Sequence, residues 1–142
     1  MLLLISFPGP MEYGIIAIAL LIIIAPIYFY IINLQGLLNK ISEKNRMIHP
    51  DQLWYLLIPV VNIVYHFIVV DKINSSLKRE FASHQSIHTD PNFTYRVGLA
   101  MCIFTCLVPF FAYAGVVAFV FWILYWIKTA DMKDQLIMQQ SS

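Results

Sequence analysis

Four residues with polar or conformationally special side chains recur at helical spacing inside one long apolar stretch. They are Tyr55, Pro59, Asn62 and His66. Their separations of four, three and four positions place them on one face of a helix. A histidine and an asparagine on such a face could relay a proton or bind a small polar solute. They could equally form hydrogen bonds between packed helices, worth about 0.6–2 kcal/mol each.

A transport relay normally needs a carboxylate or a basic group beside the histidine. The apolar stretches hold none, because Glu12 and Asp71 lie only at their edges. The sequence therefore favours a packing role for this stripe. It leaves three residues as a candidate intramembrane polar site: Tyr55, Asn62 and His66.

Two further pairs stand four residues apart and raise the question of metal binding. On a helix, His84 and His88 would face one ion, and Cys102 and Cys106 would share a face. Only Asp90 lies near the histidines as a third ligand. The cysteines lie in an apolar run, which is typical of small buried side chains. We therefore expect no metal and no cofactor.

No sequence motif of an enzyme is present. The chain lacks the nucleophile elbow G-x-S-x-G, the Walker loop, the zinc motif H-E-x-x-H and the dinucleotide-binding glycine pattern. Its formal net charge of +1 gives no general attraction to nucleic acid. We therefore expect a non-enzymatic protein that does not bind nucleic acid.

The composition is that of a membrane protein. Hydrophobic residues make up 60% of the 142 residues and charged residues 12%, whereas soluble domains average about 45–50% and about 25%. A soluble domain of this length could not bury so much apolar surface, but a bilayer can. The sequence predicts a single domain over residues 1–142, all-α and integral to the lipid bilayer.

Three windows without Asp, Glu, Lys or Arg mark the expected spans. They cover residues 13–39, 52–70 and 97–127, and a spanning helix needs about 20 apolar residues. The third window would be about 46 Å long as one helix, well beyond a core of about 30 Å. Pro109 and Gly115 favour two shorter helices there. The sequence predicts a bundle of four transmembrane helices at about 13–34, 52–70, 95–108 and 113–132, with three spans as the alternative.

Two polar connectors, 35–51 and 71–94, join these spans. The second begins with a short amphipathic helix that extends from the second span, with an apolar face of three residues: Ile73, Leu77 and Phe81. Its basic residues are candidate membrane-surface contacts for anionic headgroups: Lys72, Lys78 and Arg79. The alternative is that this helix only packs against the end of a neighbouring span.

Lysine and arginine gather on the cytoplasmic side of membrane proteins. With four spans, the termini and second connector carry six of them and the first connector three, so both termini are expected in the cytoplasm. With three spans, five basic residues lie on one side of the membrane and four on the other, which favours neither orientation. If residues 53–70 enter and return without crossing, every basic residue lies on one side and the N-terminus outside. We expect residues 1–10 to be either a short tail or an artefact of an upstream start.

Two segments, LWYLLIPVVNIVYHFIVVDKINSSLKREF and FWILYWIKTADMKDQL, carry aromatic-rich motifs over about half the chain. Their characteristic residues are Trp54, Pro59, Asn62, Phe67, Ser76, Leu77, Glu80, Phe81, and Tyr125 to Lys128. They resemble a loose group of small, multi-spanning bacterial membrane proteins of unknown function. The resemblance implies four membrane helices and supplies no catalytic residue.

These features predict a multi-pass protein of the bacterial inner membrane. We expect it to be a small subunit or scaffold that acts through helix–helix contacts with another membrane protein or with a second copy of itself. The alternative is a small transporter or channel-like protein with its polar intramembrane site at Asn62 and His66.

Overall fold

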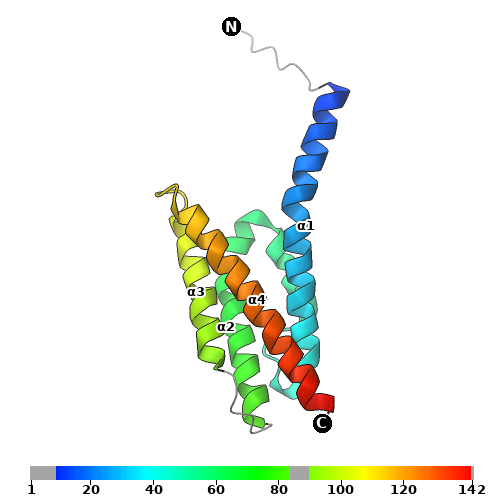
Figure 1. Ribbon diagram of the computed structural model, residues 1–142, viewed down its shortest axis with the longest axis vertical. Helices are drawn as coiled ribbons and strands as arrows, with labels where there is room; N and C mark the ends of the chain where they lie inside the picture. The colour runs from blue at the N-terminus through cyan, green and yellow to red at the C-terminus, as the bar shows by residue number, and fades with distance from the viewer. Residues whose placement is uncertain (1–8, 84–89, 142) are drawn as a thin grey trace.

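The protein is all-α in a computed structural model that describes residues 9–83 and 90–141 (Figure 1), which confirms the all-α part of the predicted fold class. The described chain holds four α-helices: α1 (Pro10–Lys40), α2 (Pro59–Ser83), α3 (Pro91–Leu107) and α4 (Ala114–Ser141). It also holds two 3-10 helices between α1 and α2: η1 (Glu43–Asn45) and η2 (Pro50–Leu57). Two helices, α1 and α4, are long and apolar enough to cross a membrane by length and composition.

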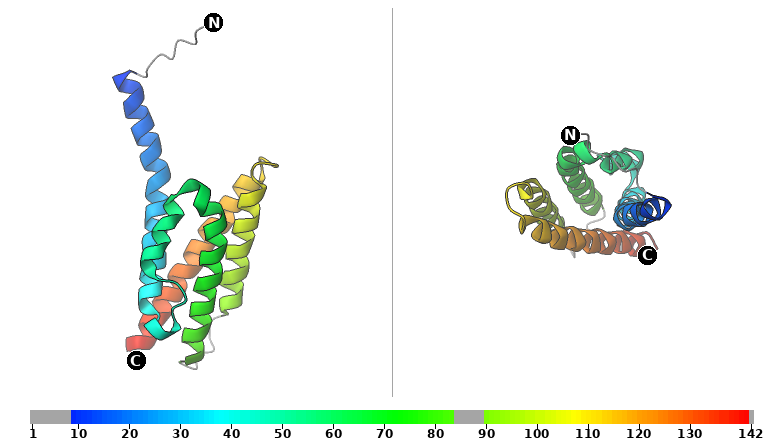
Figure 2. Two further views of the ribbon diagram at one scale, coloured as in Figure 1. Left: turned by 180° about the vertical axis from the view of Figure 1, so that it is seen from behind. Right: turned by 90° about the horizontal axis from the view of Figure 1, so that it is seen from above.

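The long helix α1 has two halves with different surroundings. Its start is capped, because the backbone N–H of Gly9 donates to the Glu12 carboxylate at 2.9 Å and Pro10 occupies the first turn. Every side chain from Pro10 to Ile24 is exposed, whereas Tyr30 and five of the ten residues after it in α1 are buried. The first half of α1 therefore projects beyond the rest of the molecule (Figures 1 and 2).

The expected second span, 52–70, is not one helix. The backbone of Ile58 is extended, at φ −84° and ψ 111°, and separates η2 from α2. The cause is Pro59, since a proline disfavours helical backbone in the residue before it and has no N–H to donate. The chain reverses direction at this point, so η2 and α2 form a hairpin (Figure 2).

The direction of η2 follows from its contacts with α1. The Gln35 side-chain amide donates to the Pro50 carbonyl at 3.1 Å, and the rings of Tyr28 and Trp54 lie 5.8 Å apart. As the residue number rises along η2, the contacted residue on α1 falls, so the two elements are antiparallel. The hairpin thus enters and leaves at the same end of the molecule, the end that holds the last turn of α1.

The two polar connectors, expected on opposite sides of the membrane, lie at this same end. Glu80 on α2 is 1% exposed, and its carboxylate accepts hydrogen bonds from Ser42 and Asn45 in the first connector. Arg46 donates to the carbonyls of Leu38 and Ile41, which closes the end of α1. We call this the polar end of the molecule.

The third charge-free window forms two helices, as predicted. Asp90 caps α3 by accepting from the Asn92 N–H at 2.9 Å, and Pro91 follows at the first helical position. α3 and α4 form a second hairpin whose turn, residues 108–113, lies at the opposite end from its termini (Figure 1). α4 continues nine residues beyond the expected end at position 132. Its extension packs on the bundle, where Leu136 is buried and the Gln140 amide donates to the Lys40 carbonyl at 2.8 Å.

The buried core lies toward the polar end, where all four α-helices meet. Gly98 on α3 allows the tightest approach, because an added Cβ would lie 2.7 Å from both Tyr125 on α4 and Val70 on α2. The apolar stripe of the predicted amphipathic helix also joins this core, with Ile73, Leu77 and Phe81 all buried. That segment is the continuous end of α2, so the packing alternative is the one the structure supports.

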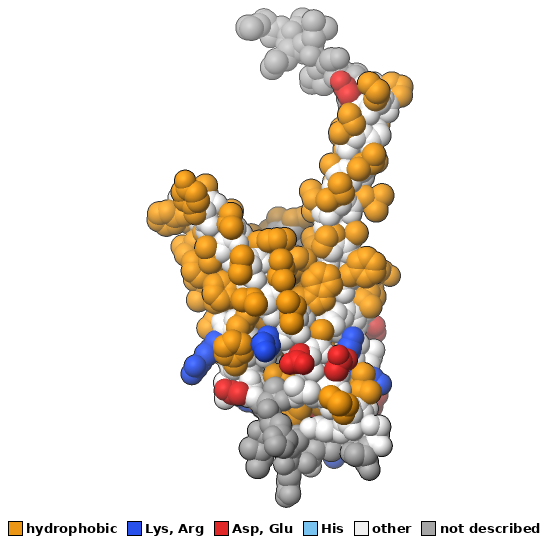
Figure 3. Space-filling model, viewed as in Figure 1, with side chains coloured by type: hydrophobic (Ala, Val, Ile, Leu, Met, Phe, Trp, Pro, Cys, Tyr) orange, Lys and Arg blue, Asp and Glu red, His pale blue; other side chains and the backbone are white. Residues whose placement is uncertain are grey.

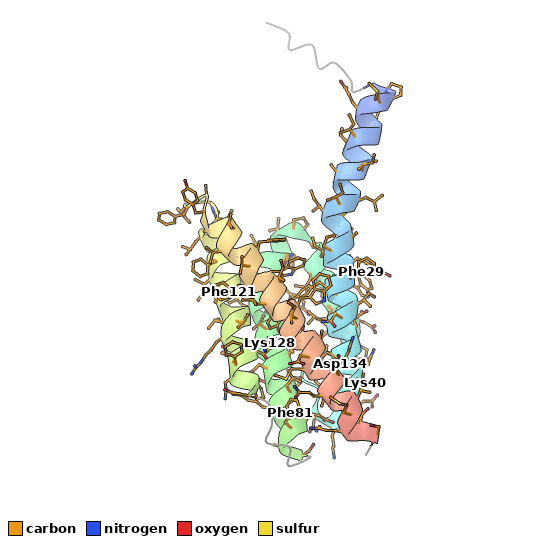
Figure 4. All side chains as sticks on the ribbon, in the orientation of Figure 1. Phe29, Lys40, Phe81, Phe121, Lys128 and Asp134 are labelled. Atoms are coloured by element: carbon orange, nitrogen blue, oxygen red, sulfur yellow. The ribbon has the colours of Figure 1, made fainter. Side chains whose placement is uncertain are left out.

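Charged side chains divide the molecule into two zones. All nine Lys and Arg residues lie in the connectors or in the parts of the helices nearest the polar end. Figure 3 shows those on its visible face below an orange apolar surface. Figure 4 places Lys40, Lys128 and Asp134 at this boundary, with Phe29 and Phe121 above it. The beginning of α1 and the end of α4 lie at opposite ends of the molecule (Figure 1).

Candidate functional site

The polar residues inside the apolar zone form a short hydrogen-bonded chain. The Tyr30 hydroxyl on α1 lies 2.9 Å from Nε2 of His66 on α2, and Nδ1 of His66 lies 3.2 Å from Oδ1 of Asn62. An amide oxygen only accepts hydrogen bonds, so Nδ1 carries the imidazole proton and Nε2 accepts from the tyrosine hydroxyl. The chain therefore runs in one direction, from Tyr30 through His66 to Asn62.

Of the predicted stripe, only Asn62 and His66 are brought together. Pro59 begins α2 and breaks the helix on which the stripe was expected. Tyr55 falls on η2, is 53% exposed, and sets the edge of its ring against Tyr65 at 5.7 Å. Tyr55 therefore lies outside this set of hydrogen-bonded residues, and its part in a polar site stays a prediction.

Tyr30 is the member of the site that the sequence did not reveal. Its ring is 2% exposed and packs against the rings of Trp122 and Trp126 on α4, at 5.5 and 6.1 Å. It lies 36 positions before His66 in a window with two other tyrosines and one phenylalanine. Only the tertiary structure, which brings the Tyr30 hydroxyl within hydrogen-bond distance of His66, selects it, so no local signal could have found it.

A pocket of about 450 Å³ lies beside these hydrogen-bonded residues and is lined by side chains from all four α-helices. Its walls include Ile27 of α1, Pro59, Asn62 and His66 of α2, Thr105 of α3, and Trp122 of α4. The residues that line it are mostly apolar, and none of those described is a carboxylate, lysine or arginine. Such a pocket can hold a neutral, largely apolar ligand and offer it a few hydrogen bonds.

A second polar contact joins α1 to α4 nearer the polar end. The Asn33 amide donates to the Thr129 hydroxyl at 3.0 Å, and both residues are buried. The Lys133 ammonium lies 3.4 Å from the Asn33 carbonyl oxygen, and its stem crosses Gly36. This cluster fastens the two helices together, as the hydrogen bonds between membrane helices do.

The remaining candidates are placed as follows. Lys78 and Arg79 are exposed near the polar end and Lys72 is half-buried, so their contact with lipid headgroups stays a prediction. His84 and His88 lie outside the described residues. Cys102 is buried and Cys106 exposed, so the two thiols do not share one environment.

Comparison with models of protein families, with curated proteins and with solved structures finds no match to this chain. The family resemblance drawn from its sequence motifs therefore rests on those motifs alone.

Proposed function

We propose that this chain is an integral membrane protein whose first helix crosses the bilayer. The charge-free part of α1, residues 13–39, is about 40 Å long at about 1.5 Å per residue, which exceeds a hydrocarbon core of about 30 Å. Its exposed first half bears large apolar side chains on every face, including Ile15, Leu21 and Ile22 at 61% exposure or more. Such a surface is stable in lipid and costly in water.

In this arrangement, the two hairpins enter the bilayer from the polar end and return to it. The charge-free part of α4, residues 114–127, is about 20 Å long, which is shorter than the core. The tip of the α3–α4 hairpin bears exposed aromatic residues: Phe110, Phe111 and Tyr113. We place this tip inside the bilayer. This replaces the expected four crossings with one complete crossing by α1 and two hairpins that return.

The proposed orientation follows from the basic residues. All nine lie toward the polar end, so the positive-inside rule places that end in the cytoplasm and the start of α1 outside. The sequence alone favoured both termini in the cytoplasm. The orientation proposed here is instead that of the alternative in which residues 53–70 enter the membrane and return, with the N-terminus outside.

The function supported best is that of a small membrane subunit or scaffold that acts through helix–helix contact. The observation that carries this proposal is the first half of α1, which projects past both hairpin tips and contacts none of the described helices there (Figures 1 and 2). One side of it forms a shallow groove of about 480 Å³, which includes Ala17, Leu21 and Ala25. Its two alanines, Ala17 and Ala25, lie about two helical turns apart on this side, and small residues let a second helix approach closely.

The test compares two substitutions of the same kind on opposite sides of α1. Ala17→Phe fills the groove, whereas Ala19→Phe adds the same bulk two positions away, about 200° around the helix. After purification in a mild detergent, the wild type and Ala19→Phe should form an oligomer or retain a membrane-protein partner, and Ala17→Phe should lose it. A monomeric wild type with no co-purifying protein would exclude this function.

A second candidate is a small transporter or channel-like protein with its site at Asn62 and His66. The observation that favours it is the pocket beside the chain from Tyr30 to Asn62. Its test is solute or proton flux into liposomes that contain the purified protein. Flux lost in His66→Ala and Asn62→Ala, with assembly intact, would support it. Absent flux, or flux equal to wild type in both variants, would exclude it.

A further inference from the structure

We propose that the pocket beside Asn62 binds a neutral, bilayer-soluble molecule through a carbonyl oxygen. Isoprenoid-type quinones and fatty-acyl esters are the two sources of this chemistry in a membrane. The inference rests on the membrane placement proposed above. It goes beyond helix–helix contact, and it holds whether or not α1 binds a partner.

The direction of the hydrogen-bonded chain decides what the pocket offers. Because Asn62 Oδ1 accepts from His66, the Asn62 Nδ2 group keeps its N–H donors, and it donates to no other group among the described residues. Asn62 also lines the pocket. An amide donor in apolar surroundings is costly when unpaired, so a ligand that supplies an acceptor is favoured.

The first turn of α2 begins at the pocket wall and carries further N–H donors. Pro59 lies at the pocket wall, and the N–H groups of Val60 and Val61 in the first turn have no helical carbonyl to donate to. The helix dipole also places partial positive charge at this end. Both features favour an oxygen acceptor with partial negative charge, such as a carbonyl.

The walls exclude a charged ligand and suit a flat apolar one. None of the described lining residues carries a formal charge, so a phosphate or a carboxylate would be buried without a counter-charge. Trp122 and Phe119 line one side, with ring centroids 5.8 Å apart. A volume of about 450 Å³ admits a six-membered ring, or an ester group with its adjoining carbons.

The pocket is also placed for entry from the bilayer. Its lining runs from Ile27 on α1 to Val108 and Gly115 at the tip of the α3–α4 hairpin. Figure 3 shows an apolar notch between this tip and the projecting half of α1. With the tip inside the bilayer, this notch faces acyl chains, so a lipid-soluble molecule can enter sideways.

The test uses fluorescence quenching of Trp122 in the full-length protein in detergent, with Trp54 and Trp126 changed to phenylalanine. The probes are a decyl-substituted benzoquinone, a methyl dibromostearate, and a dibromo-octadecane that lacks a carbonyl. We expect saturable quenching by at least one carbonyl probe and none by the alkane. Saturation by the quinone alone assigns the quinone source, and saturation by the ester alone assigns the acyl ester.

Variants of two asparagines on α2 separate binding from folding. Asn62→Leu removes the amide and should weaken binding about 5- to 10-fold, the value of one hydrogen bond. Asn62→Gln keeps an amide and should retain most of the affinity. Asn74→Leu makes the same change on the same helix outside the pocket and should leave affinity within about twofold of wild type.

Three results would overturn the proposal: saturable quenching by the alkane equal to that by the carbonyl probes, unchanged affinity in a folded Asn62→Leu variant, or no saturable quenching in a folded wild type. Circular dichroism reports folding in each case. Extraction of cell membranes at alkaline pH tests membrane placement separately. If the protein stays in the membrane but binds no probe, the proposed ligand binding is refuted and the proposed membrane placement is not.

Discussion

The Asn45 side-chain amide donates to the Glu80 carboxylate at 2.7 Å, which joins two connectors that lie 35 positions apart in the sequence. If every apolar window crossed the membrane, these residues would lie on opposite sides of it. Their hydrogen bond places both connectors at the polar end, so the segment between them, residues 46–79, leaves that end and returns to it. The membrane topology proposed above rests on this relationship.

Glu80 is expected to stabilise the fold strongly. Glu80→Ala leaves the Ser42 N–H and the Asn45 amide without their acceptor, and hydrogen bonds to a charged group are worth about 1.5–3 kcal/mol each. We predict a loss of about 3 kcal/mol in the free energy of unfolding, measured by denaturation in detergent. Glu43→Ala, at an exposed position in the first connector, should change it by less than about 0.5 kcal/mol.

Cysteine labelling in intact cells tests the proposed topology. In a background with Cys102 and Cys106 changed to alanine, Lys44→Cys and Arg79→Cys should both react only with reagents that reach the cytoplasm. Gly9→Cys should react from outside. Phe111→Cys, at the hairpin tip, should resist charged reagents from either side. Labelling of positions 44 and 79 from opposite sides would restore the four-crossing topology, and labelling of position 111 from outside would mean that the α3–α4 hairpin crosses.

Gly98 is expected to tolerate no side chain. In Gly98→Ala, the new Cβ would lie 2.7 Å from Tyr125 and from Val70, so α3 must move away from its neighbours. We predict a loss of about 1–3 kcal/mol in the free energy of unfolding. Gly14→Ala is the matched control, since nothing lies within 4 Å of its added Cβ. It should be neutral or stabilise α1 slightly, by up to about 1 kcal/mol. Equal effects of the two changes would refute the close packing at Gly98.

The Tyr30 hydroxyl should stabilise the fold through its hydrogen bond to His66. Tyr30→Phe keeps the ring and removes the donor to His66 Nε2, which then stays unpaired beside apolar groups. We predict a loss of about 1–3 kcal/mol in the free energy of unfolding. Tyr28→Phe makes the same change at a position that is 46% exposed, and it should shift the value by less than about 0.5 kcal/mol. A Tyr30→Phe variant as stable as wild type would mean that the hydroxyl contributes nothing there.

Much of the secondary structure was predictable, because its signals are local. Pro109 and Gly115 indicated the break between α3 and α4, and the charge-free window of 13–39 indicated a long apolar helix. The candidate site was predictable only in part. The spacing placed Asn62 beside His66, as the structure does, whereas Tyr55 lies apart on η2 because the chain does not continue as one helix through Pro59.

The sequence by itself determined the all-α fold class, the apolar segments and the break between α3 and α4. These depend on composition and on the missing N–H and restricted backbone around proline, which act on neighbouring residues only. The tertiary structure alone decided whether an apolar segment continues or turns back, since 19 charge-free residues suit a crossing helix and a returning hairpin equally. It also selected Tyr30 as the partner of His66 and Glu80 as the partner of Asn45. Those contacts join residues about 35 positions apart, and no local preference of the chain specifies them.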